Sequence, residues 1–258
     1  MQQVRHAGSV RFAKIKMAEI RTELRIGVLA IQGAFFEHRA ALLKALNNSP
    51  FHKDVDLEVI DIREPEQLSG LHGLILPGGE STTMSLFLQS NNFHDVLREW
   101  VAAKETPRVV WGTCAGLILL SNAIEAQKEG GQAKIGGIDV TTSRNFFGRQ
   151  VNSFETEVKL HSNLLSNCST SNEGVSVTEN GTSYHGVFIR APAVVSVDSP
   201  KVEVLATIDL PYRKEPVVVG VAQENLMATA FHPELTEDTR WHAFFLKKIL
   251  EKMNVGKQ

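Results

Sequence analysis

Short apolar runs alternate with longer amphipathic stretches along the first half of the chain. Residues 26–31, 73–76 and 109–111 are nearly continuous apolar runs, which are typical of strands buried on both faces. A further strand is predicted at residues 57–62, and residues 35–46 carry apolar side chains at helical spacing. The pattern therefore predicts strands separated by helices.

Three more helices are predicted in this half. One is capped by Ser81 or Thr82, one spans residues 93–103, and one spans residues 115–126. Strands that alternate with helices in this way predict a parallel sheet with helices on both faces. The active site of such a sheet is expected at the carboxyl ends of its strands.

The second half of the chain is richer in predicted strands. They span residues 150–160, 184–189, 202–207, 217–222 and 227–231. A last helix is predicted at residues 237–253, and the polar stretch 162–180 is predicted to be a mobile loop. We interpret the whole as one α/β domain with an antiparallel extension, in preference to two domains.

Composition excludes several classes of protein. Lys and Arg number 27 against 29 Asp and Glu, and this net charge of −2 argues against a nucleic-acid binder. No run of 18 apolar residues occurs, so no membrane-spanning helix is predicted. The chain shows no apolar run of a secretory signal, so we expect a cytoplasmic protein. Two cysteines, Cys114 and Cys168, are too few for a disulfide framework.

Residues 1–24 differ from the rest because they are basic, with Glu19 and Glu23 as their only acids. A disordered extension is one interpretation, and an upstream start with Met17 as the working initiator is another. A mitochondrial transit peptide is the third, but the segment has one serine and few arginines. We favour the first two.

Cys114 lies in Gly112-Thr-Cys-Ala-Gly116, between a predicted strand and a predicted helix. This is the G-x-nucleophile-x-G pattern with Cys in place of Ser, in which small neighbours let strand and helix pack closely. The turn places the sulfur at a helix N-terminus, which favours thiolate, and offers the N–H of Ala115 to an oxyanion. An inert buried cysteine is the alternative. Cys168 lacks this context and is interpreted as an incidental loop cysteine.

A thiol nucleophile needs a general base and a third group that orients the base. His232 and Glu234 are two residues apart after a predicted strand, and such residues point to the same side of extended backbone. They are predicted as base and orienting acid, with a surface turn as the alternative. His185 is a weaker alternative base. Ordinary helix, loop or strand-edge settings are expected for His38, His52, His72, His94, His161 and His242.

Residues 77–83, Pro-Gly-Gly-Glu-Ser-Thr-Thr, follow a strand and open a helix. The loop lacks the Gly-Lys-Ser/Thr of a P-loop, and no dinucleotide fingerprint occurs in the chain. Adjacent glycines expose N–H groups suited to an oxyanion or a carboxylate, and Glu80 suits an ammonium group. The loop therefore favours an amino-acid-like ligand over a nucleotide, with a simple turn and N-cap as the alternative.

Three of these motifs, at residues 77–82, 112–116 and 232–234, together resemble the class I (triad) glutamine amidotransferases. More narrowly, the chain resembles the glutaminase subunits of pyridoxal 5′-phosphate synthase. The stretches that carry this narrower resemblance are residues 27–33, 144–150, 186–192 and 231–238. The resemblance covers about residues 26–253.

The resemblance implies a single-domain, flavodoxin-like three-layer sandwich with a mostly parallel central sheet and a small antiparallel extension. The domain is expected over residues 25–254, after the extension of residues 1–24. Hydrolysis of L-glutamine to L-glutamate and ammonia, without cofactor or metal, is the implied activity. The ammonia would pass through a tunnel to a synthase subunit with a (β/α)8 barrel.

Carried over by position, Cys114, His232 and Glu234 match the catalytic triad, and Gly79 and Ala115 the oxyanion donors. The positions that match glutamine-binding residues are Gly79, Glu80, Ser81, Arg144, Ile189 and Arg190. Gln32 and Gly33 match the loop expected near the synthase interface. Arg144 is expected to meet the substrate carboxylate, and Glu80 its ammonium group.

Two other functions use the same features. A γ-glutamyl hydrolase would act through the same three residues without a partner, but is expected to carry a secretory signal. A redox sensor or chaperone with a cysteine elbow would have no use for His232 and Glu234. A glutaminase assay with and without synthase subunits discriminates among the three.

Overall fold

The computed structural model describes residues 21–89, 92–103, 108–125, 134–144, 146–148, 153–161 and 183–255. Two predicted segments fall outside these described residues: most of the extension of residues 1–24, and the loop of residues 162–180, which contains Cys168. Within the described part, no helix is long and apolar enough to cross a membrane.

Five parallel strands form the centre of the fold. They are β1 (Thr22–Leu29), β2 (Val55–Ile62), β3 (Gly73–Leu76), β4 (Val109–Thr113) and β12 (Leu226–Thr229). Their order is β2-β1-β3-β4-β12, and each neighbouring pair is parallel. Counted along the chain this is the 2-1-3-4-5 order of flavodoxin-like sheets, so the predicted parallel sheet is confirmed.

The first strand begins earlier than the apolar run indicated. β1 starts at Thr22, so the predicted boundary between extension and domain, at residue 24, falls inside a strand. Exposed or half-exposed residues alternate with buried Leu24 at this end, as in a strand with one solvated face. A search for continuous apolar runs detects only the fully buried half that follows.

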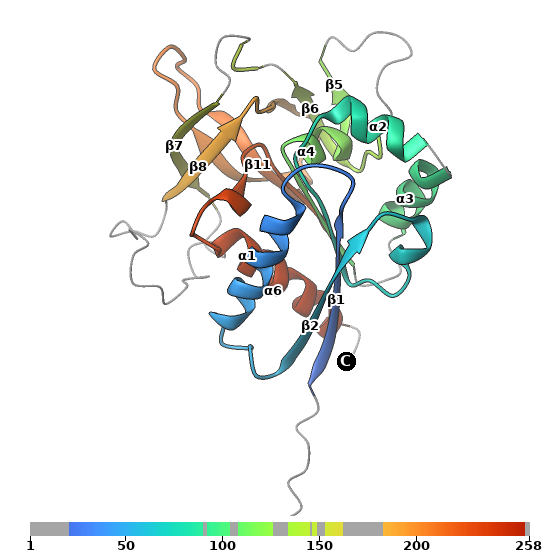
Figure 1. The fold of residues 1–258 in the computed structure, drawn as a ribbon. Helices are drawn as coiled ribbons and strands as arrows, with labels where there is room; N and C mark the ends of the chain where they lie inside the picture. Colours follow the sequence, from blue (N-terminus) through green and yellow to red (C-terminus); the bar gives the residue numbers. More distant parts are fainter. Residues whose placement is uncertain are drawn as a thin grey trace, which may run out of the picture.

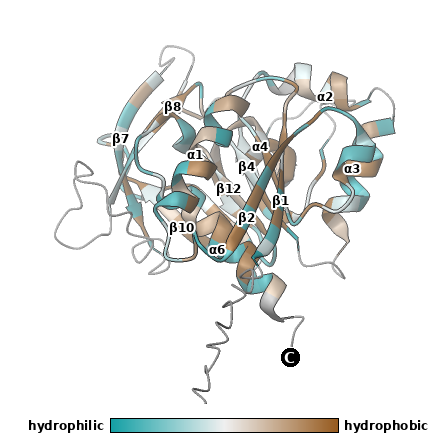
Figure 2. Cartoon of the chain, turned by 60° about the horizontal axis from the view of Figure 1, so that its bottom comes forward, coloured by the Kyte–Doolittle hydropathy of each residue, from teal (hydrophilic) through white to brown (hydrophobic). Residues whose placement is uncertain are grey.

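Helices cover both faces of the parallel strands (Figure 1). On one side lie α1 (Phe35–Asn47) and α6 (Arg240–Val255), which pack against each other. On the other side lie α2 (Ser81–Gln89), α3 (Phe93–Ala102) and α4 (Ala115–Leu120). Figure 2 shows hydrophilic and hydrophobic residues together on α1 and α3, as expected of helices that cover a core.

An antiparallel extension continues the sheet beyond β12. Its strands are β11 (Val217–Gln223), β10 (Glu203–Ile208), β7 (Ser153–Leu160) and β8 (Ser183–Ile189), in this order. A branch from β11 contains β9 (Ala193–Val197), β6 (Ile138–Ser143) and β5 (Ser121–Ile124). The sequence pattern predicted the first four of these strands and missed the branch.

The helix predicted at residues 115–126 is half as long as expected. α4 ends at Leu120, and residues 121–124 form β5 beside β6. The hydroxyl of Ser121 donates a hydrogen bond of 2.7 Å to the carbonyl of Leu117. Such a side-chain bond to the preceding turn competes with the helix and favours its termination.

Candidate active site

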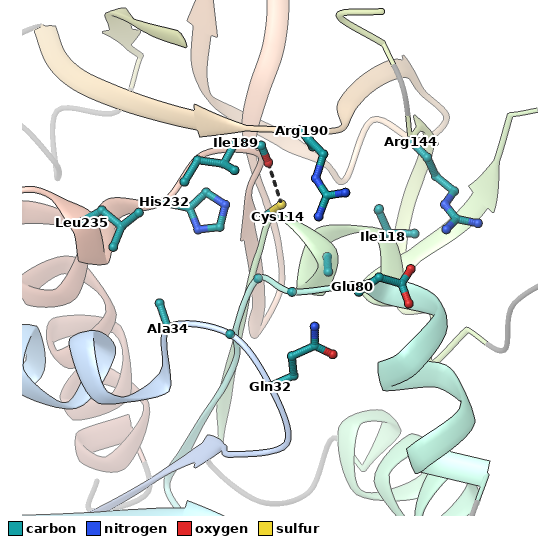
Figure 3. Close-up of a pocket in the computed structure, with 14 residues that line it drawn as sticks. Gln32, Ala34, Glu80, Cys114, Ile118, Arg144, Ile189, Arg190, His232 and Leu235 are labelled. Carbon is teal, nitrogen blue, oxygen red and sulfur yellow. Dashed lines mark hydrogen bonds between the residues drawn. The ribbon is translucent and has the colours of Figure 1, made fainter. Parts of the chain in front are cut away.

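Four loops meet at one edge of the sheet, because the adjacent parallel strands β1, β3, β4 and β12 all end there. They enclose a cavity of about 340 Å³. Eight predicted site residues line it: Gly79, Glu80, Cys114, Ala115, Arg144, Ile189, Arg190 and His232. The sheet topology thus brings together residues that are far apart in the sequence (Figure 3).

Cys114 sits on a strained turn between β4 and α4. Its φ of 51° and ψ of −101° are rare for a residue with a side chain, which is typical of a nucleophile elbow. A Cβ on Gly116 would lie 2.0 Å from the carbonyl oxygen of Leu76, and one on Gly112 would lie 2.4 Å from the backbone of Gly116. Glycine on both sides is therefore required by close packing, as the sequence motif predicted.

The thiol of Cys114 is buried, with 6% of the residue exposed, and reaches the cavity. Its Sγ lies 3.9 Å from the carbonyl oxygen of Ile189, to which the thiol can donate a weak hydrogen bond. Ala115 is the first residue of α4 and also lines the cavity. Because the first N–H groups of a helix have no partner within it, this N–H is suited to bind an oxyanion beside the sulfur.

His232 and Glu234 are in contact as the sequence predicted. The distance from Nδ1 of His232 to Oε1 of Glu234 is 2.8 Å, and both residues are buried. A carboxylate at Nδ1 favours a proton on that nitrogen and leaves Nε2 to act as base. Figure 3 shows the imidazole beside Cys114, and within the described part of the chain Nε2 has no hydrogen-bond partner.

Charge interactions in this cluster favour the imidazolium. Burial lowers the pKa of His232, but its interactions with Cys114 and Glu234 outweigh burial and raise the pKa to about 10. For Glu234, burial raises the pKa, and the interactions with His38 and His232 lower it below its ordinary value. Glu234 is therefore ionised at neutral pH and can stabilise a proton taken up by His232.

The glycine loop after β3 passes directly under the imidazole. A Cβ on Gly78 would lie 2.4 Å from Cε1 of His232, so only glycine fits there. The N–H of Gly78 donates to Oγ1 of Thr113 at 3.1 Å and is turned away from the cavity. Gly79, the next residue of this loop, has a φ of +155° and lines the cavity.

Glu80 has a structural contact in addition to its place in the cavity wall. Its Oε2 accepts hydrogen bonds from the N–H of Thr83 at 2.6 Å and from Oγ1 of Thr83 at 2.8 Å. Glu80 therefore caps α2, and the predicted cap at Ser81 or Thr82 is wrong. Ser81 is the first residue of α2, and its side chain lies outside the described part.

The antiparallel extension supplies the other walls of the cavity. Ile189 ends β8, Arg190 follows it with a φ of 44°, and Arg144 follows β6. Figure 3 shows Arg190 and Gln32 projecting into the cavity from opposite walls. Two arginines and one glutamate around the same space suit a ligand that carries both a carboxylate and an ammonium group.

The histidine predictions need two corrections. His185, the alternative base, is exposed on β8, and its Nε2 lies 2.8 Å from Oε2 of Glu155. It is not part of the cavity wall. His38 and His242, expected in ordinary settings, are both fully buried, and Nε2 of His38 lies 3.3 Å from Oε2 of Glu234.

A signal for these two buried histidines was present in the sequence. His38 precedes the buried residues Ala41 and Leu42 of α1 by three and four positions, so it belongs to the apolar face. His242 has the same relation to Phe245 and Leu246 in α6. A histidine within an apolar stripe is a buried polar group that needs partners.

Other cavity residues were not predicted to bind the substrate. Gln32 and Gly33, expected near a synthase interface, line the cavity, and so do Ala34, Gly78, Ile118 and Leu235. Gly33 is in close contact with the glycine loop, since a Cβ on it would lie 1.8 Å from the carbonyl oxygen of Gly78. Among the described residues, no group of three or more His, Cys, Asp or Glu side chains could hold a metal ion.

Comparisons with known proteins place the chain in a family. The family model for the SNO glutamine amidotransferase family matches residues 28–251. A probable pyridoxal 5′-phosphate synthase subunit PDX2 of Arabidopsis thaliana is 44% identical over 246 residues, covering 88% of this chain and 87% of the relative. The pyridoxal 5′-phosphate synthase subunit PdxT of Thermococcus gammatolerans is 42% identical, over 88% of this chain and all of its own.

Solved structures show the same fold. A glutamine amidotransferase crystal structure superposes with a TM-score of 0.64 at 37% identity, covering 87% of this chain and 98% of its own. The glutaminase domain of Trypanosoma brucei CTPS, solved with bound acivicin, reaches a TM-score of 0.53 at 12% identity, over 88% and 94% of the two chains. The second likeness concerns the fold alone.

Proposed function

The chain belongs to the SNO glutamine amidotransferase family, and we propose that Cys114, His232 and Glu234 are the triad with which it hydrolyses L-glutamine to L-glutamate and ammonia. The ammonia serves the synthesis of pyridoxal 5′-phosphate, in line with the names of the relatives. The observation that carries this proposal is the hydrogen bond between His232 and Glu234 beside a cysteine on a strained turn.

The first half of the reaction forms a thioester. The thiolate of Cys114 attacks the side-chain amide carbon of glutamine, and His232 holds the proton that the thiol has lost. The negative oxygen that develops is stabilised by the N–H groups of Ala115 and Gly79. His232 then donates its proton to the amide nitrogen, the carbon–nitrogen bond breaks, and ammonia leaves.

The second half releases the acid. Nε2 of His232 takes a proton from water, and the resulting hydroxide attacks the thioester carbon at the same oxyanion position. The carbon–sulfur bond breaks, glutamate leaves, and the proton returns to sulfur. Glu234 accepts the Nδ1–H of His232 throughout, which holds the imidazole in one tautomer.

The substrate is recognised by charge at the far end of the cavity from the sulfur. Arg144 binds the α-carboxylate, with Arg190 adding positive charge, and Glu80 binds the ammonium group. Gly79, Ser81 and Ile189 complete the predicted contacts with glutamine. The mixed charges of the lining support a zwitterionic ligand over a phosphate.

A second subunit receives the ammonia. We propose that this partner is a synthase subunit with a (β/α)8 barrel and that the ammonia reaches it through a tunnel. We expect both proteins in the cytoplasm. The support is the name shared by the relatives, which are subunits of pyridoxal 5′-phosphate synthase. Gln32 and Gly33 lie on the loop between β1 and α1, at the edge of the cavity, where such a partner can reach the active site.

A glutaminase assay of matched cysteine variants tests the triad. Cys114→Ala is expected to abolish ammonia release from L-glutamine while the circular dichroism spectrum and the binding of the synthase subunit stay unchanged. Cys168→Ala is the control, since Cys168 is the other cysteine of the chain, and it is expected to keep full activity. Turnover that survives in Cys114→Ala contradicts the assignment.

The same assay separates the rival functions. The barrel subunit stimulates a synthase-dependent glutaminase, and this enzyme releases little glutamate from γ-glutamyl peptides. A γ-glutamyl hydrolase cleaves those peptides without any partner. A redox sensor forms an oxidised Cys114 under mild peroxide and shows no glutaminase turnover in either condition.

A further inference from the structure

A chain of buried polar groups extends the triad into the core, behind Glu234. Nε2 of His38 lies 3.3 Å from Oε2 of Glu234 and 3.2 Å from Oγ1 of Thr113. Nδ1 of His38 lies 3.1 Å from Nε2 of His242. His38, Thr113 and His242 are each 0% exposed, so solvent does not compete for these contacts. None of the three lines the substrate cavity.

The charge of Glu234 determines where the protons of this chain lie. Glu234 is ionised, and a lone pair of His38 facing a carboxylate at 3.3 Å would be repulsive. Nε2 of His38 therefore carries the hydrogen, and Nδ1 is an acceptor. His242 must then donate its Nε2–H to His38, which fixes the tautomers of both rings.

The hydrogen on His38 is directed at Oγ1 of Thr113, which lies within hydrogen-bond distance. Oε2 of Glu234 has no hydrogen-bond partner among the described residues, so its contact with the same nitrogen at 3.3 Å is electrostatic. Oγ1 of Thr113 also accepts the N–H of Gly78, in the loop that carries the proposed oxyanion donor Gly79. One imidazole thus contacts the acid of the triad and, through one hydroxyl, the oxyanion loop.

Aromatic packing fixes the position of this imidazole. His38 lies edge-on to Trp111 at a ring separation of 5.6 Å, and His242 lies edge-on to the same indole at 4.9 Å. Burial lowers the pKa of His38, so the ring is neutral and adds no charge to the core. The charged and titratable groups around it are Glu234, His232 and His242, with Glu37 beside it on α1.

We propose that His38 is a positioning residue for glutamine hydrolysis: its Nε2–H group holds the carboxylate of Glu234 in place and, through Thr113, fixes Gly78 under the imidazole of His232. The proposal rests on the proposed glutaminase function. It assigns to α1 a direct part in the geometry of the site, although α1 contributes no side chain to the triad.

Substitutions at His38 separate positioning from general stability. His38→Leu removes both the hydrogen bond to Thr113 and the contact with the carboxylate of Glu234, and its kcat is expected to fall about 10- to 100-fold. KM should change less than about twofold, because His38 does not touch the cavity. His38→Gln places an N–H near the position of Nε2 and is expected to restore most of kcat.

The pH dependence of kcat in the His38 variants distinguishes positioning from a purely structural role, because a loss of stability alone would not shift it. The N–H of the neutral His38 ring faces the carboxylate of Glu234 and favours its ionised form, so loss of this N–H raises the pKa of Glu234. The acid limb of kcat in His38→Leu is therefore expected at higher pH than in the wild type. Leu42→Ala is the matched control, because Leu42 is buried one turn further along α1. It should lower the melting temperature and leave kcat and its pH profile unchanged.

A second pair of variants keeps the proposal testable if His38→Leu fails to fold. Thr113→Val removes the hydroxyl that links His38 to Gly78, and kcat is expected to fall about tenfold, whereas Thr113→Ser keeps kcat near wild type. The proposal is overturned by equal kcat in His38→Leu and His38→Gln, by an unmoved acid limb, or by equal kcat in the two Thr113 variants. A wild-type chain without glutaminase activity would instead overturn the proposed function.

Discussion

The backbone at Cys114 stores strain in the folded state. A φ of 51° in a residue with a side chain costs on the order of 1–3 kcal/mol, and the surrounding contacts must compensate for it. The N–H of Cys114 donates to the carbonyl of Thr229 at 2.8 Å, and Gly116 lies against Leu76. The thiol is thereby held toward the cavity before substrate arrives, which is what an efficient nucleophile requires.

The bond between Glu234 and His232 gives a prediction at the scale of one atom pair. Glu234→Gln removes the charge that stabilises the imidazolium, and kcat is expected to fall about 100- to 10,000-fold. The pKa of His232, raised to about 10 in the wild type, should fall, because Glu234 is one of the groups that raise it. Stopped-flow glutaminase kinetics and an NMR titration of the imidazole measure the two effects.

Glu237→Gln is the control for that variant. Glu237 is three positions further on, exposed, and paired with Lys44 on the surface. Its replacement should leave kcat and the pKa of His232 unchanged. Equal kcat in Glu234→Gln and the wild type would remove Glu234 from the triad.

The sequence predicts a site residue when its partners are close to it in the chain, and misses it when they are far away. Cys114 and Glu234 were found because their partners are a few residues away in the chain. His38 was missed as a partner of Glu234 because the two are far apart in the sequence and meet only when α1 packs beside the loop after β12. Its place on the apolar face of α1 indicated burial, but no local pattern indicates which group it touches.

At the scale of elements, the pattern detected strands that are buried on both faces. β3 was predicted with its observed bounds because its four residues form one apolar run. β6 and β9 were missed, because polar residues alternate along β6 and three of the five residues of β9 are exposed. These two strands pair with each other at the margin of the sheet, so only tertiary contact distinguishes them from loops.

The packing of α1 on α6 buries His242 completely, and this burial predicts that the fold is sensitive to acid. Burial, followed by the influence of His38, lowers the pKa of His242 well below its ordinary value of 6.5. Below about pH 6.5 His242 is protonated in the unfolded chain but stays neutral in the folded chain. The free energy of unfolding therefore decreases as the pH falls. His242→Phe removes this proton, and the slope of unfolding free energy against pH should decrease by up to about 1.4 kcal/mol per pH unit.

Urea unfolding between pH 4.5 and 8 measures that slope. His185→Phe is the matched control, because His185 is exposed on β8, and its slope should equal that of the wild type. A slope in His242→Phe as steep as in the wild type would show that the α1–α6 interface does not exclude a proton at this position.

At the scale of the molecule, the parallel sheet separates the site from the start of the domain. The cavity lies at the carboxyl ends of β1, β3, β4 and β12, whereas residues 1–20 join the chain before the amino end of β1. The eight residues of β1 span roughly 26 Å. The segment before Arg21 is therefore attached to the edge of the sheet opposite the active site.

This separation predicts the outcome of truncation. A chain that starts at Arg21 keeps all of β1 and the whole cavity, so its melting temperature and its glutaminase kcat should equal those of the full chain. A chain that starts at Ile26 loses the pairing of Thr22–Arg25 with β2 and should melt at a lower temperature. Calorimetry and a glutaminase assay on both forms test the point. If the chain that starts at Arg21 loses kcat while its melting temperature stays unchanged, residues 1–20 have a direct part in catalysis.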